Sequence, residues 1–389
     1  MSALHEVEPG RTEARLAAPT AQSHAANLAV LPDGDLGCVW FGGTQEGVHD
    51  IRIWFSRLSA DTWSEPVALS DDPERSEQNP VLFAAPDDSL WLFWTAQHAG
   101  HQNTAEVRTR RSTDSGRTWS EPRVLLPATE TGGVFVRQPV QVTPDGTWLL
   151  PSFSCRTPET GTWSGGEDTS AVYASTDDGW TWTRHDVDDS RGAVHMNVLP
   201  AAEGYVALYR SRFADNIKHS ASADGLHWSA PVPTALPNNN SSVQATRLAD
   251  GRLALVYNAS SAADASHRRA GLYDEVDDHG ALGGTERAPV AVGETAADDR
   301  QAFWGAPRTP IALATSADDG RTWQRHPDLA QGEGNALTNN SRDGLNTELS
   351  YPSITQDAQG YVHVAYTHHR SSIRHTRIAP DWPGWQETR

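Results

Sequence analysis

The sequence predicts an all-β protein, a six-bladed β-propeller built from four-stranded antiparallel blades. A turn motif rich in Asp, Gly and Trp recurs along the chain, and six hairpin signals follow one another at intervals of roughly 50 residues. The 389 residues include 15 Trp, 31 Gly and 24 Pro, which favours short strands and turns over long helices. A closed ring of blades explains these observations, because it uses many short strands and leaves only short, protected edges.

The turn motif has the pattern Ser-x-Asp-x-Gly-x-Thr-Trp. Full copies occupy 112–119, 175–182 and 316–323, a shortened copy occupies 222–228, and a degenerate copy ends at 61–63. In a tight turn the carboxylate can accept backbone N–H bonds, and Gly can adopt a positive φ. The Trp that follows can fill the gap between neighbouring sheets. We therefore predict that the repeated carboxylates are structural and lie in peripheral turns: Asp114, Asp177, Asp224 and Asp318.

The hairpin signal consists of a strand, a tight turn and a second strand rich in β-branched and aromatic residues. Its six copies span 27–40, 81–94, 140–150, 197–209, 245–257 and 353–366. The last interval is about twice as long as the others, because it holds an insertion at about 259–307 that is rich in Ala, Asp and Gly. We interpret this insertion as a loop or lid over one face. The predicted organisation is an N-terminal extension at 1–20 and a single propeller domain at 21–389.

The formal net charge of −19 argues against a nucleic-acid or anionic-membrane partner, since phosphate contacts need a basic surface. An acidic ligand would be repelled at long range, so a local cluster of Arg would have to capture it. Cys38 and Cys155 are expected to be buried free thiols, and no Cys spacing indicates a metal. No cofactor is expected.

The first 20 residues carry several charges and no apolar core, so they do not read as a signal peptide. No apolar run along the chain is long enough to span a bilayer. The expectation from the sequence is a cytoplasmic protein.

A ring of polar residues stands at the start of the innermost strand of each predicted blade. In a propeller these starts surround one mouth of the central funnel, where convergent polar groups make a small-molecule site. The ring consists of His24, Gln78, Asn79, Arg137, Gln138, His195, Asn197, Asn240, Gln244, Glu348 and Tyr351.

The ends of the second strands and the loops after them face the same mouth. They add Glu46, His49, Asp50, His98, His101, Arg210, Arg212, His368, His369 and Arg370. The spacing of His98 and His101 could suit a metal, but no third ligand follows nearby in the sequence. We therefore predict substrate binding for both and no metal site.

The hairpins and the Ser-x-Asp-x-Gly-x-Thr-Trp turns together resemble the Asp-box (BNR) repeats of the sialidase superfamily, from about His24 to Ile378. That family consists of six-bladed propellers that process glycans. The resemblance implies three Arg that bind the substrate carboxylate, a Tyr nucleophile assisted by a Glu, and an Asp acid/base. Tyr351 is similar to the nucleophile, Arg210 and Arg308 to the second and third Arg, and Asp50 falls in the loop of the catalytic Asp.

Two positions depart from the family pattern. His24 stands where the first Arg is expected, and His195 stands where the Glu that assists the Tyr is expected. A phenol is a weak nucleophile unless a base or nearby cations assist it, and either His could be that base. Arg137 could take over part of the carboxylate clamp by bidentate pairing.

The same His, Tyr and Arg set also suits β-elimination at a uronic acid. In that reaction Arg neutralises the carboxylate, while His and Tyr exchange protons with C5 and the leaving oxygen. Three hypotheses therefore remain open. The leading one is exo-acting hydrolysis, of the exo-sialidase type, that removes a terminal acidic sugar from an oligosaccharide or glycan. The second is a propeller lyase, and the third is a non-catalytic propeller that binds glycans.

The candidate residues divide into two groups. The predicted catalytic residues are Tyr351, His24, His195 and Asp50. The predicted substrate-binding residues are Arg137, Arg210, Arg308, Gln78, His98, His101, Gln244, Glu348 and Arg370.

Overall fold

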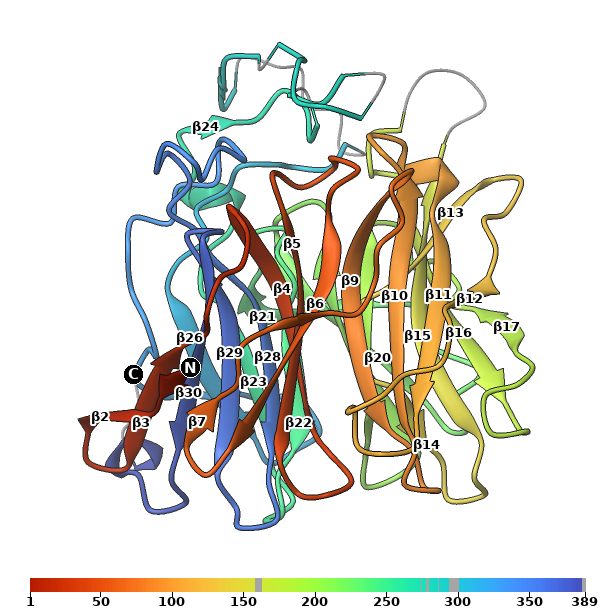
Figure 1. Cartoon of the computed structure of the whole chain (residues 1–389), viewed down its shortest axis with the longest axis vertical. Helices are drawn as coiled ribbons and strands as arrows, with labels where there is room; N and C mark the ends of the chain where they lie inside the picture. The colour runs from red at the N-terminus through yellow and green to blue at the C-terminus, as the bar shows by residue number, and fades with distance from the viewer. Residues whose placement is uncertain (158–162, 274, 278–279, 286, 294–300, 387–389) are drawn as a thin grey trace.

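The computed structural model describes residues 1–389 except 158–162, 274, 278–279, 286, 294–300 and 387–389. Six antiparallel sheets form a ring, which confirms the predicted six-bladed β-propeller (Figure 1). Helical structure within the described residues is limited to three 3-10 turns, η1 (Gln102–Thr104), η2 (Ala262–Asp264) and η3 (Pro383–Trp385).

The first three blades follow the chain in order, each listed from its innermost strand outward. Blade 1 comprises β4 (Gln22–Val30), β5 (Leu36–Gly43), β6 (Arg52–Ser59) and β7 (Thr62–Trp63), with β8 (Val67–Ala68) and β1 (Ser2–Ala3) at its outer edge. Blade 2 comprises β9 (Arg75–Ala84), β10 (Leu90–His98), β11 (Glu106–Ser112) and β12 (Arg123–Leu126). Blade 3 has an interrupted inner strand and comprises β13 (Gly132–Val136), β14 (Gln141–Val142), β15 (Trp148–Arg156), β16 (Thr169–Ser175) and β17 (Thr183–Asp186).

The remaining blades complete the ring. Blade 4 comprises β18 (Ala193–Pro200), β19 (Tyr205–Ser211), β20 (Asn216–Ser222) and β21 (Val232–Pro237). Blade 5 comprises β22 (Gln244–Arg247), β23 (Leu253–Asn258), β26 (Ile311–Ser316) and β27 (Gln324–Arg325). Blade 6 comprises β28 (Leu349–Gln356), β29 (Val362–His368), β30 (Ser372–Ile378), β3 (Arg11–Arg15) and β2 (His5–Glu8).

The N-terminal residues form outer strands of blade 6, whereas the sequence suggested an extension at 1–20. Strand β3 pairs with β30 along its whole length, so the start of the chain supplies the fourth strand of blade 6. Ala14 and Leu16 are buried there, and Glu13 accepts a hydrogen bond from Arg374. The sequence does not predict this strand, because it has few apolar side chains and its charged side chains are paired with neighbours only in the folded protein.

The repeated turns have the predicted structural role and connect the third and fourth strands of their blades. The carboxylate of Asp114 accepts hydrogen bonds from the backbone N–H of Arg117 at 3.0 Å and of Thr118 at 2.8 Å. Bonds from Thr118 and Ser112 hold the pKa of Asp114 well below its usual value. Trp119 packs against the apolar core between blades 1 and 2. These carboxylates are fully engaged locally and are not catalytic candidates.

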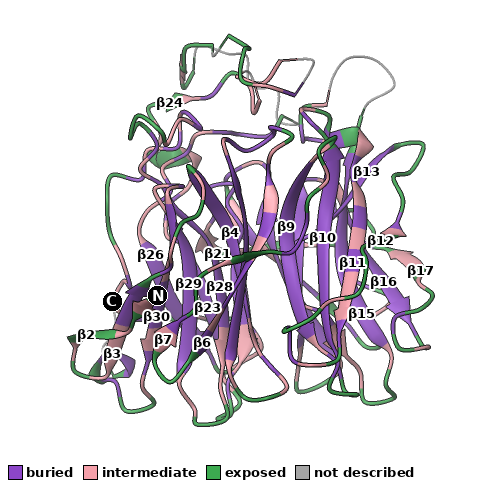
Figure 2. Ribbon diagram, viewed as in Figure 1, coloured by how far each residue is buried: buried purple, intermediate pink, exposed green. Residues whose placement is uncertain are grey.

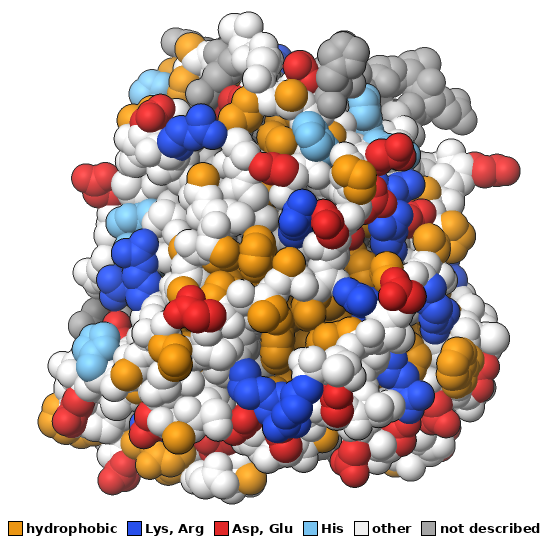
Figure 3. Space-filling view, viewed as in Figure 1, with side chains coloured by type: hydrophobic (Ala, Val, Ile, Leu, Met, Phe, Trp, Pro, Cys, Tyr) orange, Lys and Arg blue, Asp and Glu red, His pale blue; other side chains and the backbone are white. Residues whose placement is uncertain are grey.

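The core lies between the blades, and most strand residues are buried (Figure 2). Large aromatic side chains such as Trp40, Trp94 and Trp148 are almost fully buried. Cys38 and Cys155 are buried free thiols, as expected. Acidic and basic side chains are interspersed over the side of the ring seen in Figure 3. Within the described residues, no helix is both long and apolar enough to cross a membrane.

Part of the predicted polar ring joins neighbouring blades. The side-chain oxygen of Asn197 in blade 4 accepts a bond from the backbone N–H of Ala245 in blade 5 at 2.6 Å. Gln244, a predicted substrate-binding residue, accepts a bond from the N–H of Ile354 at 2.7 Å and donates one to Gln138 at 3.0 Å. Buried polar groups near the axis must be paired, so these residues have a structural use whether or not a ligand binds.

Candidate active site

The inner strands of four blades carry a β-bulge at the mouth of the funnel. At each bulge a non-glycine residue adopts the left-handed conformation: Ala25 (φ 59°), Asn79 (φ 50°), His195 (φ 54°) and Tyr351 (φ 50°). The register of each pair shifts at this point, so two residues of the inner strand oppose one aromatic residue of the second strand: Trp40, Trp94, Tyr209 and Tyr366. Such backbone strain costs about 1–3 kcal/mol per residue and gathers at functional sites, where it re-aims side chains.

A small chamber lies where these bulges meet. Its water-accessible volume is about 30 Å³, far below the roughly 300–1,000 Å³ of small-molecule pockets, so the lining side chains nearly fill it and a sugar can enter only after some of them move. All six blades and the insertion after β23 contribute side chains, blade 5 through Arg308 just before β26. The lining residues are Glu46, Gln78, Asn79, Gln102, Phe135, Phe153, His195, Arg210, Arg212, Leu272, Tyr273, Trp304, Arg308, Tyr351 and Arg370.

Tyr351 is the centre of this chamber. Arg210 donates a hydrogen bond from Nη1 to the Tyr351 hydroxyl. The guanidinium carbons of Arg137, Arg210 and Arg308 lie 5.6, 5.5 and 5.5 Å from the centre of the Tyr351 ring. A phenol surrounded by three cations is placed to develop negative charge on its oxygen, which suits a nucleophile or a proton donor.

Arg137 lies under the chamber and not in its lining. Its Nη2 donates hydrogen bonds to the backbone oxygens of Ala26 at 2.9 Å and Tyr351 at 3.2 Å. Its Nε and Nη1 are buried and have no hydrogen-bond partner in the described part of the chain. Burial lowers the pKa of Arg137 to about 10, so the side chain is charged at neutral pH. These contacts hold the bulge of Tyr351 in place.

Glu348 pairs with two of the chamber arginines. Arg308 Nη1 lies 2.9 Å from Glu348 Oε1, and Arg370 Nε lies 3.2 Å from Oε2. Burial alone would raise the pKa of Glu348, but Arg308 and Arg370 hold it well below its usual value. Arg370 also donates a hydrogen bond to Glu46. The carboxylate therefore fixes both guanidinium groups at the chamber wall.

His24 and His195 flank Tyr351 as neutral imidazoles. Their ring centres lie 4.3 and 5.8 Å from that of Tyr351. Neither nitrogen of His24, nor Nδ1 of His195, has a hydrogen-bond partner in the part of the chain that the structure describes. Burial lowers the pKa of both well below the usual value, and nearby arginines, Arg370 for His24 and Arg210 for His195, lower it further. Neutral imidazoles can accept a proton.

The neutral state of His24 and His195 predicts that stability falls in acid. Below the ordinary His pKa of about 6.5 the unfolded chain binds protons at these positions and the folded chain does not. Each imidazole is expected to lower the free energy of unfolding by about 1 kcal/mol on going from pH 6.5 to 5.5, because the unfolded imidazole is half protonated at the start of this range. Urea unfolding at pH 7.5, 6.5 and 5.5 measures this loss. The double variant His24→Gln/His195→Gln should lose less stability over the same pH range. A wild-type stability that is flat over this range would contradict the neutral assignment.

Arg212 forms the wall beside Tyr351. It pairs with the buried carboxylate of Asp168 at 2.7 Å. Its guanidinium carbon lies 5.7 Å from the ring centres of Phe153 and Trp163 and 5.2 Å from that of Trp304. The cation is thus held between aromatic rings and already neutralised, so it shapes the chamber.

Seven predicted site residues lie outside the chamber lining: His24, Arg137, Gln244 and Glu348, whose contacts are given above, and Asp50, His98 and His101. The carboxylate of Asp50 accepts bonds from the backbone N–H of Thr44 at 3.0 and 3.1 Å, and stabilises the loop that carries Glu46. His98 and His101 are exposed on the rim, around the turn that leads into η1. Tyr351, His195, Arg210, Arg308, Gln78 and Arg370 do line the chamber.

The sequence did not single out several of the lining residues. Gln102, Leu272, Tyr273, Trp304, Phe135 and Phe153 were not among the candidates. Tyr273 and Trp304 belong to the insertion, which the sequence suggested as a loop or lid and which stands above the strand ends in Figure 1. A Tyr and a Trp in a segment otherwise rich in Ala, Asp and Gly were the one available signal.

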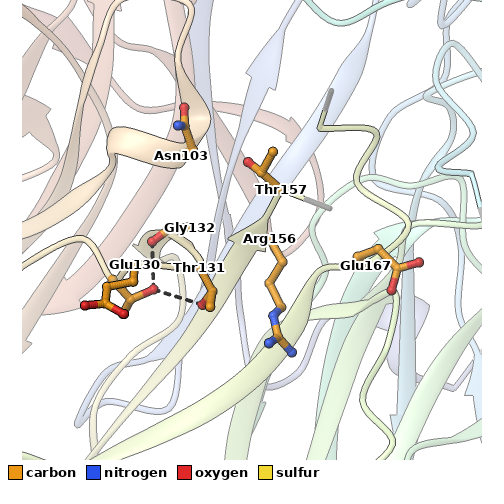
Figure 4. Close-up of a pocket in the computed structure, with 8 residues that line it drawn as sticks. Asn103, Glu130, Thr131, Gly132, Arg156, Thr157 and Glu167 are labelled. Atoms are coloured by element: carbon orange, nitrogen blue, oxygen red, sulfur yellow. Dashed lines mark hydrogen bonds between the residues drawn. The ribbon is translucent and has the colours of Figure 1, made fainter. Parts of the chain in front are cut away.

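A second, open hollow lies outside the chamber on blade 3 (Figure 4). Arg156, at the end of β15, lies between the 129–132 turn and Glu167. The hollow is lined by Asn103, Thr129, Glu130, Thr131, Gly132, Arg156, Thr157 and Glu167. Its side chains are exposed or half-buried, and it lacks the convergent arginines of the chamber. No group of three or more His, Cys, Asp or Glu that could hold a metal occurs among the residues that the structure describes.

Comparison with known proteins agrees with this architecture. Residues 34–364 match the BNR repeat-like domain. The fold is similar to the Hadza microbial sialidase Hz136 (TM-score 0.63, 16% identity, 92% of this chain and 66% of that chain). It is also similar to a protein of unknown function from Dyadobacter fermentans DSM 18053 (TM-score 0.65, 16% identity, 97% and 99%). The Trypanosoma rangeli sialidase in complex with sialic acid gives a TM-score of 0.63 at 12% identity, over 99% of this chain and 57% of that chain. No curated protein matches the sequence.

Proposed function

This chain belongs to the BNR repeat-like domain family, and from that membership and the geometry of the chamber we propose that it hydrolyses a terminal acidic sugar from an oligosaccharide or glycan. The observation that carries the proposal is the hydrogen bond from Arg210 to Tyr351, in a chamber where three guanidinium groups surround one phenol. Tyrosine serves as the nucleophile of sialidases in place of the usual carboxylate.

In the proposed reaction the Tyr351 oxygen attacks the anomeric carbon while the bond to the leaving oxygen breaks. The phenol proton passes to the neutral imidazole of His195, which lines the chamber. Arg210 and Arg308 are the groups we assign to the substrate carboxylate, since both line the chamber beside Tyr351. Water then attacks the anomeric carbon of the covalent intermediate and gives a proton to the carboxylate that protonated the leaving oxygen. The bond to Tyr351 breaks, and the Tyr351 oxygen takes back the proton held by His195.

The leaving oxygen needs a proton donor, and we assign this role to Glu46. It is the one carboxylate among the described lining residues, whereas Asp50 lies outside the lining. Arg370 and the Tyr273 hydroxyl donate to Glu46, so the carboxylate must exchange the Arg370 contact for a proton before it acts as the acid. Mutation distinguishes Glu46 from Asp50 as the proton donor. Glu46→Gln should lower turnover of substrates with poor leaving groups more than that of activated aryl glycosides, and Asp50→Asn should act mainly through loop stability.

A second candidate reaction is β-elimination at a uronic acid. The observation that favours it is the pair of neutral imidazoles, His24 and His195, whose ring centres lie within 5.8 Å of that of Tyr351. Such a site can take the C5 proton on one group and return a proton to the leaving oxygen from another. This route needs no nucleophile, so Tyr351 would act as an acid.

One assay separates these functions. The protein is incubated with sialylated and uronate-capped oligosaccharides, and ultraviolet absorbance of unsaturated uronate is followed together with the release of reducing sugar. Hydrolysis is expected to release sugar with no change in absorbance. A rise in both signals would assign elimination, and absence of both across several acidic glycans would leave a glycan-binding propeller.

A further inference from the structure

Arg210 differs from the other arginines that line the chamber. Arg212, Arg308 and Arg370 each pair with a carboxylate, whereas Arg210 pairs with none among the residues that the structure describes. Its described polar contacts are with an amide, a phenol and an imidazole: Asn240, Tyr351 and His195. Burial lowers the pKa of Arg210 to about 10, so the side chain is charged at neutral pH.

Asn240 fixes the direction of this guanidinium group. Arg210 Nε donates to Asn240 Oδ1 at 2.7 Å, and both residues are only 1% exposed. Asn240 Nδ2 donates in turn to the backbone oxygen of Phe303 at 2.8 Å. The amide oxygen must face the N–H donor and the amide nitrogen must face the carbonyl acceptor, so the orientation of the amide is determined.

The backbone of Asn240 is held as well. It adopts the left-handed conformation (φ 55°), which Asn tolerates better than most residues. Asn238 Oδ1 accepts bonds from the backbone N–H of Asn240 at 3.1 Å and of Ser211 at 2.9 Å. Because Ser211 directly follows Arg210 in β19, the side chain of Asn238 joins the segments that carry Arg210 and Asn240.

An amide orients an arginine without cancelling its charge. A carboxylate in the same place would accept the same bond and would also neutralise the guanidinium group. Asp168, Glu348 and Glu46 do this for the other lining arginines. The charge of Arg210 therefore stays available to a ligand, and its bond to the Tyr351 hydroxyl places that charge beside the proposed nucleophile.

We propose that Asn240 is a positioning residue that makes the chamber select a carboxylate over an uncharged group at the same position of the sugar. It does so by aiming Arg210 while leaving the charge of Arg210 for the substrate. The identity of the ligand rests on the proposed function, whereas the direction and the unpaired charge of Arg210 do not.

Asn240→Asp in the full-length protein tests the selectivity, because it keeps the shape of the side chain and gives Arg210 a counter-charge. Calorimetry measures the binding of glucuronic acid, of N-acetylneuraminic acid and of the methyl ester of each. The preference for acid over ester should fall about tenfold or more, since Arg210 is then neutralised before the ligand arrives. An unchanged preference would overturn the proposal.

Asn239→Asp is the matched control. Asn239 is equally buried, donates from Nδ2 to the backbone oxygen of Pro307 at 2.7 Å and to Ser260 at 3.2 Å, and has no described contact with Arg210. This variant should keep the preference for acid over ester within about threefold of the wild type. An equal loss of preference in both variants would assign the effect to any added charge and would overturn the role of Asn240.

Asn240→Gly tests the direction of Arg210 separately from its charge. Glycine adopts the left-handed conformation without strain, so this variant removes the amide and leaves the charge of Arg210 in place. Binding of the acid should weaken about fivefold or more, because the guanidinium group is no longer pre-organised. Unchanged binding of the acid would show that Asn240 does not position Arg210.

Urea unfolding tests the unpaired charge without any ligand. Both Asp variants lose a bond to a backbone oxygen and bury a carboxylate, but only the one at position 240 meets the Nε of Arg210. The urea midpoint should therefore be higher for Asn240→Asp than for Asn239→Asp. An equal or lower midpoint would show that Arg210 already has a counter-charge. If the wild type binds neither acid nor ester, the proposed function fails, while unfolding still decides the charge of Arg210.

Discussion

Replacing Tyr351 by Phe is expected to lower kcat on an acidic glycoside by on the order of 10³-fold or more, with the fold intact. The variant keeps the ring between Arg137, Arg210 and Arg308 and removes only the oxygen that Arg210 contacts. Losing a catalytic nucleophile has effects of this size or larger, whereas one hydrogen bond contributes about 0.5–1.5 kcal/mol to stability. Initial rates and urea unfolding of the same preparation separate the two effects.

Tyr366→Phe is the matched control for this experiment. Tyr366 is buried in the same blade and opposes the bulge of Tyr351 from the second strand. It does not line the chamber, so its variant should retain wild-type turnover. If Tyr351→Phe kept more than about a tenth of the wild-type rate, the nucleophile assignment and the elimination route that uses Tyr351 as an acid would both be wrong.

Replacing Glu348 by Gln is expected to have the largest effect on stability. The change keeps the shape of the side chain but leaves Arg308 and Arg370 as buried cations without their shared counter-charge. Breaking a buried ion pair by removing one partner costs about 3–5 kcal/mol. Urea or thermal unfolding measures the loss, and KM for an acidic substrate should rise as well, because both arginines lose their fixed orientation.

The control for Glu348→Gln is Glu203→Gln, an exposed Glu in the hairpin turn of blade 4. This change should alter stability by less than about 0.5 kcal/mol, as surface substitutions usually do. A loss below about 1 kcal/mol at Glu348 would show that the two arginines find other partners or water, and would remove the basis for its positioning role.

The fold was predictable because its signals are local. The Asp114 turn closes through bonds within five residues of chain, and each hairpin carries its own turn and strand pattern. The same reasoning located Tyr351, Arg210, His195 and Gln78, because all stand at strand ends that meet at the mouth of the funnel. The sequence does not show that residues 1–20 take part in the propeller, because β3 pairs with β30, a segment far away along the chain.

The rest of the site was hidden because it depends on contacts between distant segments. Whether Asp50 or Glu46 faces the chamber is decided by the fold of one loop. In this loop the backbone N–H of Thr44 donates to the carboxylate of Asp50. The sequence could not reveal that Arg137 would lie under the Tyr351 bulge and bond its backbone. Tyr273 reaches the chamber from the insertion, and its hydroxyl bonds to Gln102 of blade 2 and Glu46 of blade 1. The pattern of apolar residues along the sequence cannot predict such contacts.

The pairing of β3 with β30 also has a consequence for how the protein is made. Strand β3 leaves the ribosome long before its partner β30, so blade 6 cannot be completed until β30 has followed. At about 5–20 residues per second, β3 waits on the order of tens of seconds with an unpaired edge. Because β28 of the same blade carries Tyr351, the chemistry of the site is assembled after the other five blades have had time to fold.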